Sequence, residues 1–144
     1  MKKSIHIVLL LLVGISAFAR IIHVWTEAEM QKAAQLVIVG TVADVRDLDE
    51  TNTTLWPPWK FIGMEATIKV SKVIKGDFTN STVALHYYRI YDVDPANGPS
   101  FIHLTPTDTN QFLLYLVPDG ASRFSPVSGQ QDPSMDAVRV FHPK

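Results

Sequence analysis

Hydrophobic and polar side chains alternate over several short segments of this chain, and turn-forming residues separate these segments. Within Ala66–Ser71 the alternation has the two-residue period of a strand with one buried face. The apolar phase then shifts by one position, because Val73 rather than Lys72 is the next apolar residue, which predicts a β-bulge near residues 71–72. Strand patterns cover the segments 36–45, 61–75, 82–91, 101–104, 112–117 and 123–128.

Two of these segments are apolar on both faces. The first, 36–45, begins with an unbroken branched run and contains Gly40, and an interior glycine in a strand favours a bend or a bulge. The second, 112–117, is the most apolar run after the N-terminal region, so we expect a central strand that belongs to the core.

A short helix is predicted before the first strand. Thr26 can cap it with its hydroxyl, and Glu29, three residues later, can reach back in a capping box. Met30 and the alanines that follow give a narrow apolar stripe, and the helix should end near Gln35. Near the C-terminus, Asp132 and Pro133 can open one helical turn, whereas residues 137–141 are equally compatible with an extended chain.

Taken together, these segments predict an all-β fold: a small five- to six-stranded OB-like barrel with one short N-terminal helix. Closing the sheet removes the strand edges that would otherwise promote aggregation. Residues 20–144 have the size of one ordinary domain, so we expect a single barrel domain there.

The first nineteen residues have the pattern of a secretory signal peptide. Two lysines precede an apolar run, and Ala17-Phe18-Ala19 has the small-x-small form of a cleavage site, which places cleavage between Ala19 and Arg20. The stretch from Ile7 to Ala19 is thirteen residues long, short of the roughly 20 that a membrane-spanning helix needs. We therefore expect an exported protein, periplasmic or extracellular, without membrane insertion after leader cleavage.

Composition narrows the classes of partner. The expected leader contains two of the 13 basic residues and none of the 14 acidic ones, so that the mature net charge is −3, from 11 basic against 14 acidic residues. Such a domain has no basic surface for a phosphate backbone, and we expect no nucleic-acid partner. The chain has no cysteine, which excludes a disulfide framework, a thiol nucleophile and a cysteine-ligated zinc.

The order of several segments resembles a known family. The segments "QLVIVGTVADV", "ATIKVSKVIKGD", "VALHYYRI", "FLLYLVPDG" and "FSPVSGQQDP" are similar to uncharacterised secreted bacterial proteins related to the OB-fold barrel of tissue inhibitors of metalloproteinases and netrin modules. The resemblance covers roughly Leu36 to Pro133 and implies a five-stranded barrel. It does not imply protease inhibition, because the animal inhibitors use an N-terminal cysteine and this chain has none.

The polar loop 47–60 ends in Trp56-Pro57-Pro58-Trp59 and is the main candidate for ligand contacts. Trp56 and Trp59 could form a stiff aromatic platform for a sugar or an apolar peptide. Alternatively, these rings close one open end of the barrel as part of the core. The second irregular stretch, 92–100, contains two prolines and a glycine and is expected near the same barrel mouth.

His86 and Tyr88 share one strand face and complete the candidate ligand-binding residues. His103, on a neighbouring predicted strand, could approach His86. No pair of histidines has the spacing of a known zinc motif, however, so we expect no metal and no other cofactor. Ser128 lies in no nucleophile motif, and the isolated acids Glu65 and Asp92 have no identifiable carboxylate partner. We therefore expect no catalytic residue and no enzyme.

The sequence thus predicts an exported, non-enzymatic binding or interaction module, with contacts on the 47–60 and 92–100 loops and an unknown protein or glycan as its partner. The alternative is an inhibitor-like protein that acts on a secreted hydrolase, and a small hydrolase is a third, more distant possibility. The oligomeric state is left open by the sequence.

Overall fold

The computed structural model describes residues 23–91 and 101–143. The expected signal peptide, its cleavage site at Ala19 and Arg20, and the stretch 92–100 lie outside these described residues. In chain order the elements are α2 (Glu27–Ala33), β1 (Leu36–Asn52), β2 (Phe61–Lys75), β3 (Thr82–Ile90), β4 (Phe112–Asp119), β5 (Arg123–Pro126) and β6 (Val138–Val140). In this part of the chain, no helix has both the length and the apolar character that crossing a membrane requires.

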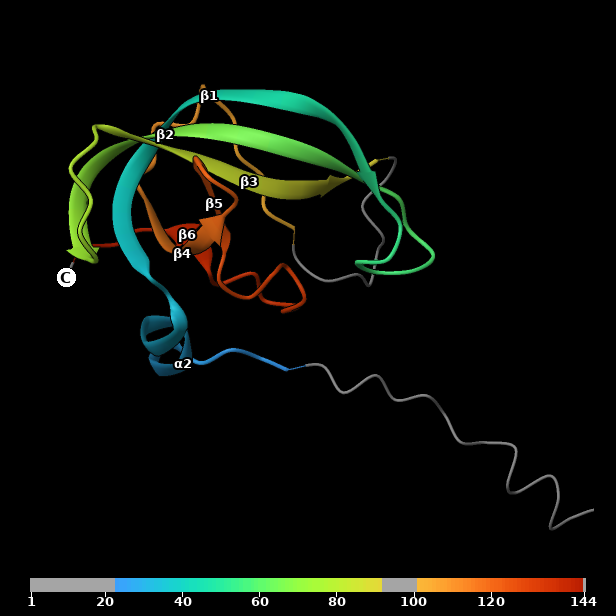
Figure 1. Cartoon of the computed structure of the whole chain (residues 1–144), viewed down its shortest axis with the longest axis horizontal. Helices are drawn as coiled ribbons and strands as arrows, with labels where there is room; N and C mark the ends of the chain where they lie inside the picture. The colour runs from blue at the N-terminus through green and yellow to red at the C-terminus, as the bar shows by residue number, and fades with distance from the viewer. Residues whose placement is uncertain (1–22, 92–100, 144) are drawn as a thin grey trace, which may run out of the picture.

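Five strands close into a ring in the order β1-β2-β3-β5-β4, and β4 pairs again with β1 (Figure 1). All neighbours are antiparallel except β3 and β5, which run parallel and meet at Leu85 and Phe124. The sixth strand, β6, pairs with the edge of β4 that faces away from β1, beside β5. The prediction of a small all-β barrel with one short helix is confirmed.

Irregularities in β1 and β2 curve the wall of the ring. A Cβ added to Gly40 would lie 2.6 Å from Ile68 Cγ2 and 2.7 Å from the Lys69 carbonyl oxygen, so only glycine allows this close approach of β1 to β2. The pairing shifts by one residue next to Gly40, and the extra residue on β2 is Ser71. The Ser71 hydroxyl donates to the Val39 carbonyl at 3.0 Å. The predicted bulge is confirmed at this position.

The interior of the ring is apolar. Alternate residues of the strands point inward, as in Val83, Leu85 and Tyr87 of β3, and form the largest core cluster. β4 contributes to two clusters, because Leu114 and Leu116 face the interior whereas Leu113 and Tyr115 face outward under the helix. The expectation that residues 112–117 form a central strand with both faces covered is confirmed.

The helix α2 lies against the outside of this wall. Thr26 is its N-cap and forms the predicted capping box with Glu29. Met30 and Ala34, each 1% exposed, pack onto the outward faces of β1 and β4. At the C-terminal end of the helix, the Lys75 ammonium donates to the backbone carbonyls of Gln31, Lys32 and Ala34 at 2.7, 3.2 and 2.6 Å.

Two local predictions need correction, and one open question is settled. Strand β1 continues past residue 45 to Asn52, so the loop is 53–60 rather than 47–60, because β1 stays paired with β2 through an irregularity between Asp47 and Thr51. The expected strand Phe101–Leu104 is irregular, and its Ile102 and Leu104 instead fill the core. Residues 137–141, left open by the sequence, contain the short strand β6.

Candidate functional site

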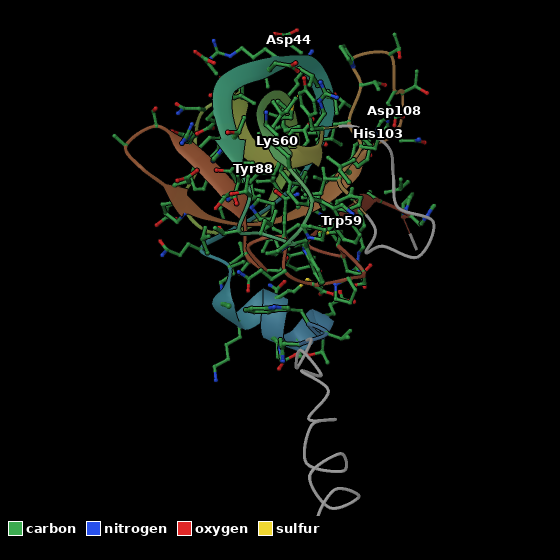
Figure 2. The ribbon with its side chains drawn as sticks, turned by 90° about the vertical axis from the view of Figure 1, so that its right-hand side faces the viewer. Asp44, Trp59, Lys60, Tyr88, His103 and Asp108 are labelled. Carbon is green, nitrogen blue, oxygen red and sulfur yellow. The ribbon has the colours of Figure 1, made fainter. Side chains whose placement is uncertain are left out.

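The loop 53–60 folds back over the outer face of β2 and β3. Asn52 starts the loop with its side-chain oxygen, which accepts from the Thr54 and Leu55 amides at 2.8 and 3.0 Å. Leu55 and Trp56 then bury themselves against Phe61. Four partly buried apolar residues surround this cluster, namely Trp59, Tyr88, Ile90 and Phe101. Figure 2 turns this end of the molecule towards the viewer and labels Trp59, Lys60 and Tyr88 on it.

The two tryptophans have different environments. Trp56 is 7% exposed and belongs to the core, as the alternative interpretation of the loop predicts. Its indole Nε1 donates to the Gln130 carbonyl oxygen at 2.9 Å. Trp59 is half-buried, while Pro57 and Pro58 between the two rings are exposed. Trp56 therefore anchors the loop from inside, and Trp59 is the tryptophan available to a ligand.

Gln130 fixes both the loop and the edge of β3. Its side-chain oxygen accepts from the Tyr88 amide at 2.6 Å, and its side-chain nitrogen donates to the Tyr88 carbonyl at 2.8 Å. This pair of bonds replaces the neighbouring strand that β3 lacks at this point. Gln130 is 2% exposed and has a φ of 55° in the left-handed region. Sequence reasoning missed it, because nothing in its local pattern distinguishes it from Gln131.

His86 lies beside Gln130 on the same outer face, with 6% of its surface exposed. Its Nδ1 is 2.5 Å from Asp119 Oδ2, and its Nε2 is 2.7 Å from Glu50 Oε1. The Nε2 contact lacks the angles of a hydrogen bond, so it is an electrostatic contact of buried atoms. Arg123 joins the group, with Nε 3.2 Å from Asp119 Oδ2. We call Glu50, His86, Asp119 and Arg123 the His86 network.

Glu50 reaches His86 because of the irregular end of β1. Leu48, Asp49 and Glu50 oppose the single residue Gly63 on β2, since Asp47 pairs with Met64 and Thr51 with Ile62. The Glu50 side chain occupies the space where a Gly63 side chain would stand. Neither the long irregularity nor the role of Gly63 follows from the strand pattern of the sequence.

Both ring nitrogens of His86 face carboxylates. The two carboxylates contact opposite nitrogens and do not converge on one point, and no group of three metal-ligating side chains occurs in residues 23–91 and 101–143. His103, which is exposed, stands well apart from Tyr88 in Figure 2.

A small open pocket of about 220 Å³ adjoins the network. His86 and Tyr88 line it together with Asp119, Gln130 and three residues that follow or end β5, Ser125, Pro126 and Gly129. Of the four residues predicted to contact a ligand, the structure thus brings His86 and Tyr88 together at this pocket. It lies below the roughly 300–1,000 Å³ of ordinary small-molecule sites.

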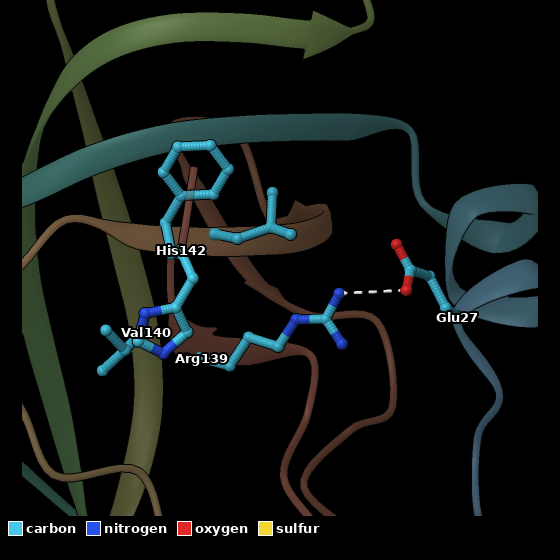
Figure 3. A pocket seen from close by; sticks show the side chains of 6 residues that line it. Glu27, Arg139, Val140 and His142 are labelled. Carbon is cyan, nitrogen blue, oxygen red and sulfur yellow. Dashed lines mark ion pairs between the residues drawn. The ribbon is translucent and has the colours of Figure 1, made fainter. Parts of the chain in front are cut away.

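A larger open pocket of about 550 Å³ lies on the other side of the barrel, between α2 and β6. Arg139 reaches from β6 across it to Glu27 at 3.2 Å (Figure 3). The Tyr115 hydroxyl donates to Glu27 at 3.2 Å, and burial raises the pKa of Tyr115, although Arg139 opposes the shift. These polar groups contact one another, which indicates a connection that holds the helix to the barrel.

The loop 53–60 and the end of β3 form a surface that we call the exposed rim. It consists of Pro57, Pro58, Trp59, Lys60 and Tyr91. Tyr91 is 50% exposed, and the Lys60 ammonium lies 4.6 Å from the centre of its ring. Tyr91 also donates its amide to the Lys60 carbonyl at 2.9 Å, so the two ends of the rim are fixed together.

Neither the protein-family models nor the curated protein sequences contain a match to this chain. The resemblance to the metalloproteinase-inhibitor and netrin barrels therefore stays a prediction.

Proposed function

We propose that this protein is an exported, non-enzymatic binding module that recognises a partner polypeptide through the exposed rim. The observation that carries the proposal is the burial of Trp56, which anchors the loop while its neighbours Pro57, Pro58 and Trp59 remain at the surface. A loop held in this way presents apolar side chains with little loss of conformational entropy on binding.

The chemistry of the rim favours a polypeptide over a glycan. A sugar-binding platform of two tryptophans needs both rings at the surface, and Trp56 is buried. What remains is a mixed surface of prolines, one half-buried tryptophan, one exposed tyrosine and one lysine. Tryptophan and tyrosine are enriched among the residues that dominate protein–protein binding energies.

The non-enzymatic part of the proposal is supported by the His86 network. A general base needs a free nitrogen directed at the group it deprotonates, and both His86 nitrogens face carboxylates.

The export part of the proposal rests on the leader pattern of residues 1–19. Mass spectrometry of the protein from the exported fraction tests it, with a mature N-terminus at Arg20 as the expected result and an intact leader as the contradicting one.

The binding surface is tested by comparing what the protein captures from the native exported fraction before and after changing the rim. The variant combines Lys60→Glu with Tyr91→Ser, both at exposed positions, and Ile74→Ser serves as the control because Ile74 is also exposed, at 45%, but lies near the other end of β2. We expect the rim variant alone to lose captured protein. Equal capture by both variants contradicts the proposal.

Two further measurements separate the alternatives. A glycan array that gives specific, rim-dependent binding would replace the polypeptide partner with a carbohydrate. A panel of secreted hydrolases tests the inhibitor alternative, and rim-dependent inhibition would identify the partner as one of these enzymes.

A further inference from the structure

The outer edge of β1 is a second exposed surface of the barrel. β2 pairs with β1 on one side as far as Asn52, but β4 pairs with the opposite side only from Leu36 to Gly40. Among the described residues, no strand pairs with the other edge of residues 41–52. Figure 1 shows this part of β1 arching over β2 as the outermost strand.

The pairing between β2 and β3 identifies which β1 groups face outward. The Val70 amide donates to the Ser81 carbonyl, and the Lys60 carbonyl accepts from the Tyr91 amide. The backbone N–H and C=O groups of even-numbered β2 residues therefore point towards β3, and those of odd-numbered residues point towards β1. Arg46 and Asp44 pair with odd-numbered residues of β2. Val45 and Asp47 therefore direct their amides and carbonyls to the unpaired edge. The register is regular from Asp44 to Asp47, which gives an incoming strand a regular section to pair with.

This edge is strongly acidic. Residues 41–52 contain four acidic side chains, Asp44, Asp47, Asp49 and Glu50, against the single base Arg46. Three of these charges have partners within the domain: Arg46 pairs with Glu65 at 2.6 Å, Asp47 with Arg89 at 3.1 Å, and Glu50 with His86. Asp44 and Asp49 are exposed and form no ion pair within the described residues.

We propose that residues 41–52 of β1 bind an extended lysine- and arginine-rich segment of a partner protein as an added strand, centred on Asp44–Asp47. Main-chain bonds to the free edge supply affinity, and the acidic side chains select the basic sequence. The inference rests on the proposed function, since it names the segment of the partner that the module recognises.

The charges also exclude a second copy of the chain as the occupant. Two β1 edges paired with each other would bring their acidic residues opposite one another, and like charges opposite each other destabilise a sheet. Acidic side chains and irregularities are known to protect edge strands from self-association. A basic strand is the occupant for which the same side chains are favourable instead.

The test uses fluorescence anisotropy with three labelled peptides. One alternates lysine with threonine and valine, one replaces every lysine by glutamate, and one keeps the lysines but carries N-methyl groups on alternate backbone nitrogens. We expect binding of the first peptide only, because the second has the wrong charge and the third cannot complete the main-chain ladder. Equal binding of the first and third peptides would show simple charge attraction and overturn strand addition.

Matched charge variants test whether the β1 edge is the binding surface. Asp44→Lys with Asp49→Lys should weaken binding of the basic peptide by about tenfold or more. Asp44→Lys alone should also weaken it, whereas Asp77→Lys makes the same charge change at an exposed position after β2 and should have little effect. Hydrogen exchange should slow at Val45 and Asp47 in the complex, and unchanged exchange there would contradict the proposal. Sedimentation that shows a dimer through this edge would also overturn it.

The outcomes for the rim and the edge are distinguishable. The proposed strand pairing does not involve Lys60 or Tyr91, and Lys60→Glu adds negative charge, so the rim variant should bind the basic peptide at least as tightly as the original protein does. Rim-dependent capture without peptide binding would leave the proposed function in place and refute strand addition at the β1 edge.

Discussion

The wall of the barrel is covered on its outside at two places, and the two covers are held in different ways. At one place α2 packs Met30 and Ala34 onto β1 and β4. At the other, the loop 53–60 packs Leu55 and Trp56 onto Phe61. Both bury apolar side chains, but only the helix has a repeating pattern of backbone hydrogen bonds. The loop is held by the Asn52 side chain at its start and by the indole bond from Trp56 to the Gln130 carbonyl.

The cap of the helix and the anchor of the loop differ in how far away along the sequence their partners lie. The N-terminus of the helix is capped by residues three positions apart, Thr26 and Glu29. The loop is held by Gln130, which is 74 residues from Trp56 and 42 from Tyr88. The comparison teaches that the start of a regular cover can be recognised from local sequence, whereas the buried anchor of an irregular one meets its partner only in the folded state.

The largest effect should come from removing the loop's anchor. Trp56→Ala leaves a cavity in the loop cluster and removes the Nε1 bond to Gln130, and should lower the free energy of unfolding by about 3–5 kcal/mol. Trp56→Phe retains a ring without the donor and should cost less. Urea unfolding measures both, with Pro57→Ala at an exposed neighbouring position as the control. A loss below about 1 kcal/mol for Trp56→Ala would contradict the anchor role.

Gln130 should have the next largest effect. Gln130→Ala leaves the Tyr88 amide and carbonyl without the side-chain partners that replace a strand, and should cost about 2–3 kcal/mol in urea unfolding. Gln131→Ala is the matched control, because Gln131 is exposed and adjacent. Hydrogen exchange at Tyr88 should accelerate in the Gln130 variant only. Equal stability of the two variants would mean that water replaces the glutamine at no cost.

The sequence allowed the features with a local signal to be predicted. The capping box of Thr26 and Glu29, the buried strand 112–117 and the bulge at Ser71 each leave a pattern within a few residues. Strand alternation also indicated enough segments for a closed barrel, because an apolar face of that kind needs a partner on the other side of the core.

The features without a local signal could not be predicted. The extension of β1 to Asn52 depends on the absence of a side chain at Gly63, eleven residues later, and on Glu50 filling that space. Phe101–Leu104 has a strand pattern, yet its apolar residues serve as interior packing without pairing. The partners of His86 come from β1 and β4, and Arg123 of β5 contacts one of them, so the His86 network exists only after the ring has closed.

Among the residues outside α2, Lys75 should contribute most to the stability of the helix on the barrel. Its ammonium donates to three carbonyls at the C-terminal end, where a positive charge also interacts favourably with the helix dipole. Lys75→Met keeps the length of the side chain and should cost about 1–2 kcal/mol. Lys72→Met is the control, since Lys72 is exposed on the same strand. A helix that is equally protected from hydrogen exchange in both variants would refute this role.

The smallest effect should come from the capping box, and its dependence on pH provides the sharper test. Thr26→Ala should lower stability by about 0.5–1 kcal/mol at neutral pH, less than either change in the loop cover.

Hydrogen bonds from the Thr26 amide and hydroxyl lower the pKa of Glu29 below its ordinary value of 4.5. A carboxyl whose pKa is lower in the folded state stabilises the fold above the unfolded value and loses that contribution as the pH falls through the folded value. The difference in stability between the original protein and Thr26→Ala should therefore be constant above about pH 5 and decrease below pH 4.5. Glu29→Gln, which keeps the shape of the side chain without its charge, should remove this dependence, and a difference that stays constant down to pH 3 would show that the cap does not depend on the charge of Glu29.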